Sequence, residues 1–253
     1  MTNIILSGCN GKMGRVITRL VEQDSECRIA AGLDINDFCE NDYPVFTNAA
    51  SCDVEADVII DFSHPSALSG LLDFAVSRNI PVIIATTGLS EEQRAALLDT
   101  SKKIPVFFSA NMSLGINLLI ALSKKAAALL EGNFDIEIVE KHHNQKIDAP
   151  SGTALAIADG LCEVLKETPE YVYDRHSVRK KRAKREIGIH AVRGGSIVGE
   201  HEVIFAGQDE VITLAHQATS KEVFAVGSIK AAKFMKGKPV GMYDMNDLIG
   251  EMI

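Results

Sequence analysis

The chain has 253 residues, of which 46% are hydrophobic, so it can bury one large core or two modest ones. This composition excludes an intrinsically disordered chain. The formal net charge of −8 at pH 7 argues against broad nucleic-acid binding, because such proteins need a positive face to displace counterions from phosphates.

No stretch approaches the roughly 18–20 uninterrupted apolar residues that a membrane-spanning helix needs. We expect no signal peptide, because the first residues lack a basic leader followed by a long apolar run. Five cysteines occur without a CxxC pair, which argues against a metal cage or a disulfide framework. We therefore expect a soluble, cytoplasmic chain with reduced thiols. The cysteines are Cys9, Cys27, Cys39, Cys52 and Cys162.

The first half alternates short apolar runs with segments of helical period, which is typical of parallel strands joined by crossover helices. Strands are expected at Asn3–Ser7, Arg28–Gly32, Asp57–Asp61, Pro81–Ala85 and Val106–Phe108. Helices are expected at Met13–Glu22, Ser66–Arg78 and Glu91–Lys102. Near-continuous Ile/Val runs indicate strands that are buried on both faces, so the sequence predicts a Rossmann-like doubly wound parallel sheet.

The pattern changes after a long helix expected at Leu114–Leu130. Strands are then expected at Phe134–Lys141, Glu186–Val192, His201–Phe205 and Val211–Gln217, with a helix at Thr153–Leu165. Most of these strands have no helix between them, which predicts a smaller α+β domain with an antiparallel or mixed sheet. The segment Glu222–Met235 and the tail Gly241–Ile253 return to a helical pattern.

Glycines recur as G-x-x-G-x-x-G after the first expected strand, at Gly8, Gly11 and Gly14, where the first helix begins. They permit a tight turn and a close approach of the backbone, while the N–H groups and the dipole at the helix N-terminus attract a pyrophosphate. Asp34 follows 20 residues after Gly14, where a carboxylate can accept hydrogen bonds from an adenosine ribose. A plain glycine turn and a surface acid are the alternative, but the order of strand, glycines, helix and acid favours a dinucleotide site.

Asp34 also bears on the choice of cofactor. Neither Ile35 nor Asn36 supplies a cation for a 2′-phosphate, so NADH matches this strand end better than NADPH does. The rival interpretation is that Lys12 or Arg15 reaches the phosphate and makes the protein tolerant of both cofactors.

Open α/β sheets bind ligands at the carboxyl ends of their strands, so the ends of the fourth and fifth strands are further candidates, although each could be an ordinary turn. The residues expected to bind the cofactor are Gly8, Cys9, Asn10, Gly11, Lys12, Met13, Asp34, Ala85, Thr86, Thr87, Ser109, Ala110, Asn111 and Met112.

The densest group of chemically active residues runs from Glu140 to Ala154, between an expected strand and an expected helix. Histidine exchanges protons near neutral pH, and a lysine ammonium can donate a proton or hold a carboxylate. Ser151-Gly152-Thr153 offers N–H groups at a helix start, which suits an anion. A zinc site is the rival for His142 and His143, but adjacent histidines with no cysteine or third histidine nearby make a poor cage, so we expect no metal.

The string from Glu140 to Ala154 closely resembles the dihydrodipicolinate reductase signature E-x-H-H-x-x-K-x-D-A-P-S-G-T-A, a long and highly specific motif. The resemblance covers nearly the whole chain. It extends to Gly8–Gly14, Ala85–Gly88, Ser109–Asn117, Arg193–Gly195, Val198–His201, His216–Gly227 and Gly241–Leu248.

The resemblance implies a cytoplasmic, homotetrameric oxidoreductase of the diaminopimelate route to lysine. Such an enzyme reduces 4-hydroxy-tetrahydrodipicolinate to tetrahydrodipicolinate with loss of water, using NADH or NADPH. The resemblance also implies a dinucleotide-binding domain built from both chain ends, residues 1–112 and 221–253, and a substrate-binding and oligomerisation domain at residues 113–220.

The same match implies roles for single residues. His142 would be the acid/base and Lys146 a proton donor, while His143, Gly152 and Thr153 would bind the substrate. The spacing from His142 to Thr153 agrees with the family motif without gaps.

Three short motifs depart from the family pattern. The usual G-T-T-G begins with Ala85, the usual N-F-S has Met112 in place of its aromatic residue, and the usual S-R ends in Lys221. Met112 loses an aromatic contact near the nicotinamide. Lys221 keeps the charge but lacks the planar fork of arginine, which puts any bidentate interaction there in doubt.

Two other functions stay open at this point. A nicotinamide-sensing regulator without turnover is compatible with the fold, but it gives no reason for the His142 and Lys146 pair. A basic stretch could serve nucleic-acid binding, but the absence of interleaved aromatics in an acidic chain favours a solvated loop or an oligomer rim. The stretch contains Arg175, Arg179, Lys180, Lys181, Arg182, Lys184 and Arg185.

Overall fold

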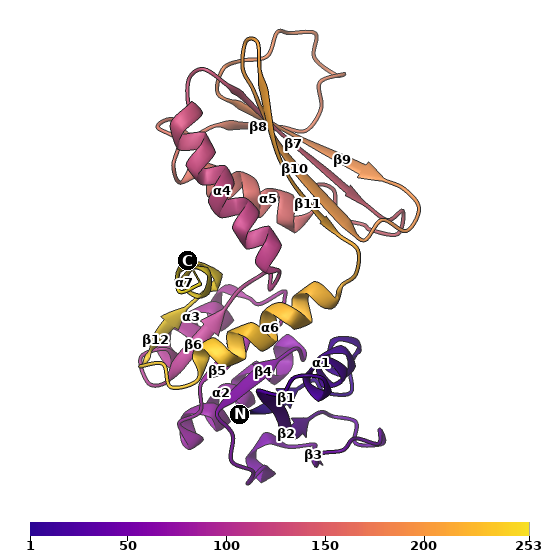
Figure 1. The fold of residues 1–253 in the computed structure, drawn as a ribbon, viewed down its shortest axis with the longest axis vertical. Coiled ribbons are helices and arrows are strands. Elements are labelled where there is room, and N and C mark those ends of the chain that lie inside the picture. The colour runs from indigo at the N-terminus through magenta and orange to yellow at the C-terminus, as the bar shows by residue number, and fades with distance from the viewer. Residues whose placement is uncertain (253) are drawn as a thin grey trace. The chain divides into compact units, whose positions relative to one another are not determined.

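The computed structural model describes residues 1–252, and the chain divides into two compact units. Unit 1 comprises Met1–Leu114 and Glu222–Ile253, and unit 2 comprises Gly115–Lys221. Figure 1 shows that unit 1 is built from both ends of the chain, coloured indigo to violet and yellow. Ile253, the last residue of the predicted tail, lies outside the described residues.

Unit 1 contains a seven-stranded sheet of order β12-β6-β5-β4-β1-β2-β3, in which every neighbouring pair is parallel. This confirms the predicted doubly wound sheet. The strands are β1 (Thr2–Ser7), β2 (Cys27–Leu33), β3 (Val45–Phe46), β4 (Val58–Asp61), β5 (Val82–Ile84), β6 (Pro105–Phe108) and β12 (Gly241–Tyr243). The helices are α1 (Lys12–Glu22), α2 (Leu68–Arg78), α3 (Glu91–Thr100), α6 (Glu222–Met235) and α7 (Met245–Gly250), with 3₁₀ turns at Ala49–Ser51 and Pro65–Ala67.

Alternate residues of β1 pack into two separate cores. Ile4 and Leu6 pack with residues of α1, α6 and α7, whereas Ile5 packs with residues of α2 and α3. All three side chains are fully buried. Because successive side chains of a strand point to opposite faces, an unbroken apolar run is the mark of a strand covered on both sides.

The prediction of a helical pattern throughout the tail is wrong. Residues Gly241–Tyr243 form β12, which pairs in parallel with β6, and the helix α7 begins only at Met245. The edge strand Val45–Phe46 was not predicted either. Both strands are too short for an alternating pattern to show in the sequence, and their pairing with a longer neighbour makes them strands.

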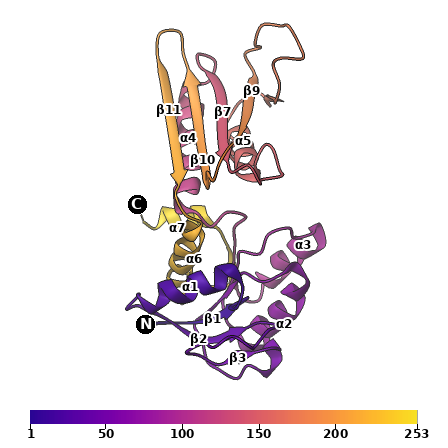
Figure 2. The same ribbon diagram turned by 90° about the vertical axis from the view of Figure 1, so that its right-hand side faces the viewer.

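Unit 2 contains a five-stranded mixed sheet of order β11-β10-β7-β9-β8, which confirms the predicted α+β domain. The pairs β7–β9 and β8–β9 are parallel, and β10 is antiparallel to both β7 and β11. The strands are β7 (Asp135–His142), β8 (Glu170–Val172), β9 (Glu186–Arg193), β10 (Gly199–Ala206) and β11 (Val211–Ala218). The helices α4 (Leu114–Leu130) and α5 (Gly152–Cys162) pack with one face of this sheet (Figure 2).

Strand β7 carries the chemistry-bearing segment further into the sheet than the sequence indicated. It ends at His142 rather than Lys141, and His142 pairs in register with Arg193 of β9. The strand alternates partly buried and buried residues, so Glu140 and His142 point to the same, helix-covered face. The predicted strand Phe134–Lys141 left His142 in the connection to the next helix, and this prediction is wrong.

The structure also differs from the prediction at α5 and β8. Helix α5 ends at Cys162 rather than Leu165, and the short strand β8 was not predicted.

No helix within residues 1–252 is both long enough and apolar enough to cross a membrane.

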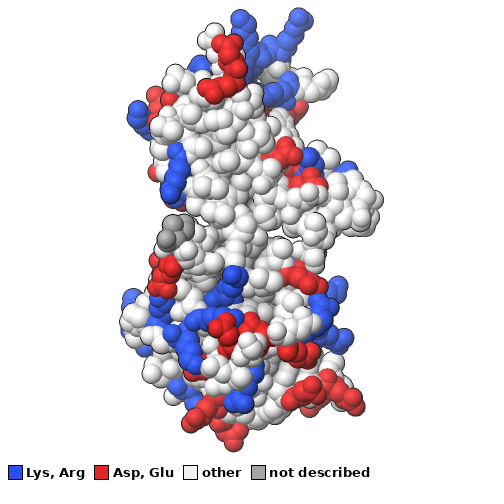
Figure 3. Space-filling view, in the orientation of Figure 1, with Lys and Arg blue, Asp and Glu red and all other residues white. Residues whose placement is uncertain are grey.

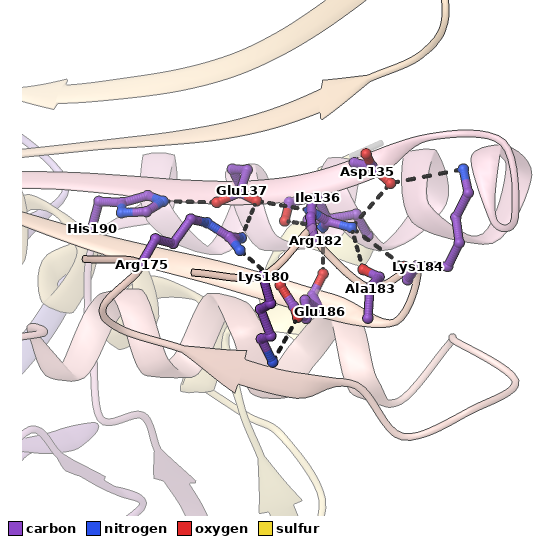
Figure 4. A network of polar contacts seen from close by, with 10 residues as sticks. All are labelled: Asp135, Ile136, Glu137, Arg175, Lys180, Arg182, Ala183, Lys184, Glu186 and His190. Carbon is purple, nitrogen blue, oxygen red and sulfur yellow. Dashed lines mark hydrogen bonds and ion pairs between the residues drawn. The ribbon is translucent and has the colours of Figure 1, made fainter. Parts of the chain in front are cut away.

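The basic stretch of unit 2 is fastened to the sheet by carboxylates of β7 and β9. Arg175 lies 2.7 Å from Glu137 Oε1 and 2.7 Å from Glu186 Oε2. Arg182 lies 2.9 Å from Glu137 Oε1 and 3.0 Å from Asp135 Oδ1 (Figure 4). Acidic and basic side chains are intermixed on the visible face of the molecule (Figure 3). The guanidinium groups of Arg175 and Arg182 are therefore paired with carboxylates of the sheet.

The fully buried Glu186 is the inner anchor of this stretch. Arg175, the N–H of Ala183 and Lys180 lower the pKa of Glu186 to about 2. Its contribution to stability is therefore present above the ordinary glutamate pKa of 4.5 and is lost as the pH falls toward 2.

We expect Glu186→Gln to loosen the segment 174–185, because the loss of the buried charge weakens its bond to Arg175. Trypsin should cleave this segment severalfold faster in the variant at neutral pH, measured by mass spectrometry of the fragments. Glu167→Gln makes the same change at an exposed position and should leave the rate unchanged. Equal cleavage of the Glu186 variant and the wild type would contradict the anchoring role.

Candidate active site

The turn between β1 and α1 accepts only glycine at two of its positions. Gly8 has φ of 78°, and a Cβ there would lie 2.6 Å from the carbonyl oxygen of Phe62. A Cβ on Gly14 would lie 2.2 Å from the carbonyl oxygen of Gly8. Gly11 is the N-cap of α1 and offers no capping side chain, which suits a site where a ligand meets the helix start.

A groove of about 1230 Å³ extends from the carboxyl ends of β1, β2 and β4 along α2. Gly8, Gly11 and Asp34 line it together with Phe62 and Ser63. Strand β1 lies between β2 and β4, so the strand order runs outward from β1 in both directions, and open α/β sheets bind their ligands at such a point. The buried Ser63 Oγ has no hydrogen-bond partner within the described residues. These features fit a dinucleotide.

Asp34 holds the glycine turn as well as the loop that follows it. Its Oδ2 accepts a hydrogen bond from the N–H of Asn10 at 3.0 Å, and its Oδ1 accepts one from the N–H of Asn36 at 3.0 Å. Arg15 donates to the carbonyl oxygen of Asn10 at 3.2 Å and contacts Cys39 Sγ at 3.3 Å. The guanidinium of Arg15 thus lies beside the same loop as Asp34, as the rival interpretation of the cofactor choice requires.

The other predicted cofactor residues differ in what they can offer. Cys9 is fully buried beneath Gly32, and Met112 is buried in the core, so these two can meet a ligand only through the main chain. Thr86 is buried and donates to Asp61 Oδ2 at 2.6 Å. The remainder, Asn10, Lys12, Met13, Ala85, Thr87, Ser109, Ala110 and Asn111, follow the carboxyl ends of β1, β5 and β6.

In unit 2 the buried carboxylate of Glu140 gathers several groups. Its Oε2 accepts hydrogen bonds from His142 Nδ1 at 2.6 Å and Arg193 Nη1 at 2.7 Å. Its Oε1 accepts hydrogen bonds from the N–H of Ser151 at 2.9 Å and Arg193 Nη2 at 2.7 Å. Burial acts to raise the pKa of Glu140, but the bonds from Arg193, His142 and Ser151 outweigh it and lower that pKa. Glu140 is therefore a carboxylate at neutral pH.

Lys146 belongs to the same connected group. Its ammonium lies 2.8 Å from Asp148 Oδ1, and Arg193 Nη2 donates to the carbonyl oxygen of Asp148 at 2.6 Å. The ammonium of Lys146 first, and the N–H of Gly152 to a lesser extent, lower the pKa of Asp148. The structure thus links both predicted proton donors through Asp148, Arg193 and Glu140.

A second buried histidine lies against the first. The rings of His142 and His201 meet edge to face, with centroids 5.2 Å apart, and His201 Nε2 lies 3.1 Å from Ser151 Oγ. Burial, followed by the neighbouring His142, lowers the pKa of His201 to about 4. His201 is therefore uncharged at neutral pH.

The predicted substrate ligands stand at the start of α5. Ser151 caps this helix by accepting the N–H of Ala154 at 3.2 Å, and Gly152 is exposed beside it. His143 begins the preceding turn, where its carbonyl oxygen accepts the N–H of Lys146 at 3.1 Å. Thr153 lies in the first turn of the helix. These residues occur within one short stretch of unit 2, as their sequence spacing implied.

Glu140, Asp148, Arg193 and His201 belong to the group but were not predicted as site residues. Glu140 and His142 are two residues apart on a strand, so a strand extended by one residue would have put both on one face. Arg193 and His201 come from β9 and β10, and only the pairing of these strands with β7 brings them to Glu140.

We expect His201 to make the protein less stable in mild acid. The unfolded chain binds a proton at this ring near pH 6.5, but the folded chain does so only near pH 4, so unfolding takes up a proton between these values. Stability falls as the pH drops through this window, by at most about 3 kcal/mol. His142, Glu140, His216 and Lys146 are the charged or titratable groups near His201.

The measurement is the melting temperature between pH 7.5 and pH 4.5. His201→Gln should flatten its dependence on pH, whereas His176→Gln, at an exposed position, should leave the dependence as in the wild type. Parallel curves for the wild type and the His201 variant would contradict the buried neutral ring.

Comparison with known proteins gives a consistent result. Residues 2–112 match the family model described as dihydrodipicolinate reductase, N-terminus, and residues 115–249 match the model described as dihydrodipicolinate reductase, C-terminus. The 4-hydroxy-tetrahydrodipicolinate reductase of Caldanaerobacter subterraneus subsp. tengcongensis is 57% identical over 98% of each chain. The protein of the same name from Clostridium tetani is 51% identical over 98% of this chain and 97% of its own. Dipicolinate-bound dihydrodipicolinate reductase from Paenisporosarcina sp. TG-14 superimposes with a TM-score of 0.82 at 25% identity, covering 97% of this chain and 99% of that chain.

Proposed function

The chain belongs to the dihydrodipicolinate reductase family, and we propose that it performs the reaction of that family with NADH as preferred hydride donor and with His142 and Lys146 as proton donors. It is an oxidoreductase of lysine biosynthesis by the diaminopimelate pathway, which reduces 4-hydroxy-tetrahydrodipicolinate to tetrahydrodipicolinate with loss of water. The observation that carries the proposal is the hydrogen bond of 2.6 Å between His142 Nδ1 and the buried Glu140.

The reaction needs a proton beside the carbon that is reduced. A bound nicotinamide supplies the hydride. Reduction leaves an electron pair on a neighbouring ring carbon of the substrate, and a positioned acid lowers the barrier by delivering a proton there. We assign this role to His142, through Nε2, and to Lys146, through its ammonium. A regulator without turnover has no use for this pair.

The start of α5 is the proposed site of a substrate carboxylate. The N–H groups of Gly152 and Thr153 and the positive end of the helix dipole suit an anion, and His143 begins the turn that leads to them. The carboxylate of Asp148 lies close enough to the Gly152 N–H for its pKa to be lowered by that bond. A substrate carboxylate would replace Asp148 there and meet the same Lys146. The dipicolinate bound to the Paenisporosarcina relative is also a dicarboxylate.

Unit 1 is the proposed dinucleotide-binding domain, and unit 2 the proposed substrate-binding and oligomerisation domain. Asp34 favours NADH because its carboxylate can accept hydrogen bonds from ribose hydroxyls but repels a 2′-phosphate.

A homotetramer is proposed for this chain, formed through unit 2. The face of the five-stranded sheet opposite α4 and α5 carries the exposed Val192 and Val211, which supports such an assembly. A cytoplasmic location is proposed with it, in keeping with five free cysteines.

We expect His142→Gln and Lys146→Ala each to lower turnover by roughly 10²-fold or more, because each removes a group that delivers a proton. Turnover is measured from NADH oxidation with freshly generated substrate. The affinity for NADH, measured by fluorescence titration, should stay near that of the wild type. The matched controls are His176→Gln and Lys181→Ala, which change exposed residues of the same types. Near-normal turnover in both site variants would contradict the assignment of proton delivery to His142 and Lys146.

We expect the wild type to have a higher kcat/KM with NADH than with NADPH, and replacement of Asp34 to narrow that gap. Asp34→Ala removes the negative charge but also the acceptor for the N–H of Asn10. Asp34→Asn removes the charge and keeps an acceptor oxygen, so it separates the electrostatic effect from damage to the glycine turn.

The alternative outcome assigns the choice to Arg15. If the wild type uses NADPH at least as efficiently as NADH, Arg15→Ala should lower kcat/KM with NADPH more than with NADH. That result would show that the interpretation of Asp34 as a barrier to the 2′-phosphate is wrong.

A further inference from the structure

We propose that the buried ion pair of Glu140 and Arg193 is the positioning element for His142, and that it sets which ring nitrogen meets the substrate. The inference rests on the proposed function, which assigns proton transfer to His142. Glu140 is 0% exposed, and its Oε2 lies 2.6 Å from His142 Nδ1. Arg193 holds the two oxygens of Glu140 with both terminal nitrogens, each at 2.7 Å.

A carboxylate can only accept hydrogen bonds, so His142 Nδ1 must carry the hydrogen in its bond to Glu140. Nε2 is then the nitrogen that exchanges a proton. In the donating form the ring carries a hydrogen on both nitrogens. The electron pair on the substrate carbon takes the proton from Nε2 to form a C–H bond, the ring is left neutral with its hydrogen on Nδ1, and solvent returns a proton to Nε2 afterwards. Throughout this cycle the bond to Glu140 stays intact. A Cβ at Gly199 would lie 3.1 Å from Nε2, so the absence of a side chain there leaves room on that side of the ring.

Glu140 itself has no freedom to turn away. Its four hydrogen bonds come from three elements: His142 on β7, Arg193 on β9, and the N–H of Ser151 at the start of α5. The fork of Arg193 matches the two carboxylate oxygens and fixes their plane. The elements therefore orient the carboxylate, and the carboxylate orients the ring.

Arg193 also connects the two proposed proton donors. Besides Glu140, it binds the carbonyl oxygen of Asp148 at 2.6 Å, and the carboxylate of Asp148 lies 2.8 Å from the ammonium of Lys146. A lysine at position 193 would keep the charge but could not hold two oxygens and a carbonyl in one plane. Arg193→Lys thus tests geometry separately from charge.

The chain supplies a matched control on the same strand. Glu137 lies on the opposite face of β7, where it binds His190 at 2.7 Å and the guanidinium groups of Arg175 and Arg182 (Figure 4). Glu137→Gln therefore makes the same chemical change in a second glutamate, histidine and arginine network. A general loss of sheet stability would affect both variants, whereas a loss of positioning would affect only Glu140→Gln.

The first experiment reads the ring directly. Nitrogen-15 NMR of histidine-labelled wild type, recorded where the ring is neutral, distinguishes a hydrogen on Nδ1 from one on Nε2, and the signals of His142 are those missing from His142→Gln. We expect the hydrogen on Nδ1. A wild-type ring with its hydrogen on Nε2 would overturn the proposal whatever the variants do.

The second experiment combines this spectrum with kinetics. Glu140→Gln and Arg193→Lys should each lower kcat by about 10-fold to 100-fold, leave the KM for NADH within about twofold, and increase the share of Nε2–H tautomer. Glu137→Gln should leave kcat and the His142 signals as in the wild type. If Glu140→Gln does not fold, Arg193→Lys and the wild-type spectrum still carry the test.

The two proposals fail in different ways. If His142→Gln retains turnover, the proposed role of His142 falls. If His142→Gln loses turnover while Glu140→Gln stays within about twofold of the wild type, only the positioning role is overturned. A loss in Glu140→Gln that Glu137→Gln matches, with no change in the His142 signals, would likewise overturn it, because such a loss is structural.

Discussion

One buried carboxylate holds the chemistry of unit 2 together. Glu140 lies out of contact with water, and an unpaired charge in that position would be strongly destabilising. It is tolerated because four hydrogen bonds reach it from β7, β9 and α5. The burial of Glu140 is therefore stable only when β7, β9 and α5 are all correctly placed around it. A buried carboxylate needs all of its hydrogen bonds, and these bonds also define the geometry around His142.

In unit 1 the proposed dinucleotide site depends on a close approach of the backbone. The carbonyl oxygen of Gly8 occupies the space that a side chain on Gly14 would need, so α1 can start directly against the end of β1. Asp34 then binds the N–H of Asn10 and ties this turn to the end of β2. The turn is thus shaped by backbone contacts that leave little freedom, whereas the site in unit 2 is shaped by side-chain charges.

The sequence was sufficient to predict the features that repeat along the chain and insufficient for those that depend on pairing. The Ile- and Val-rich runs of β1, β4 and β5 indicate strands buried on both faces. The signature from Glu140 to Ala154 contains the histidine and the lysine that were predicted to transfer protons. β12 is no shorter than β5, but Gly241–Tyr243 contains no Ile or Val run, so only its pairing with β6 defines it as a strand. Arg193 lies 53 residues from Glu140, and no local sequence pattern predicts their contact. The sequence motif indicates which residues are candidates for the reaction, but the strand register determines which residues contact them.

The division of unit 1 between the two chain ends determines the order in which its parts are synthesised and can fold. Residues 1–114 leave the ribosome before α6 and β12 exist, so β6 has no outer neighbour, and Phe107 lacks the ring of Phe234 that lies 6.2 Å away in the finished protein. Residues 115–221, by contrast, form a contiguous unit that can close as soon as it emerges. The half of the protein that is synthesised first is therefore the last to be completed, and it must stay soluble as a partial sheet while the other half folds.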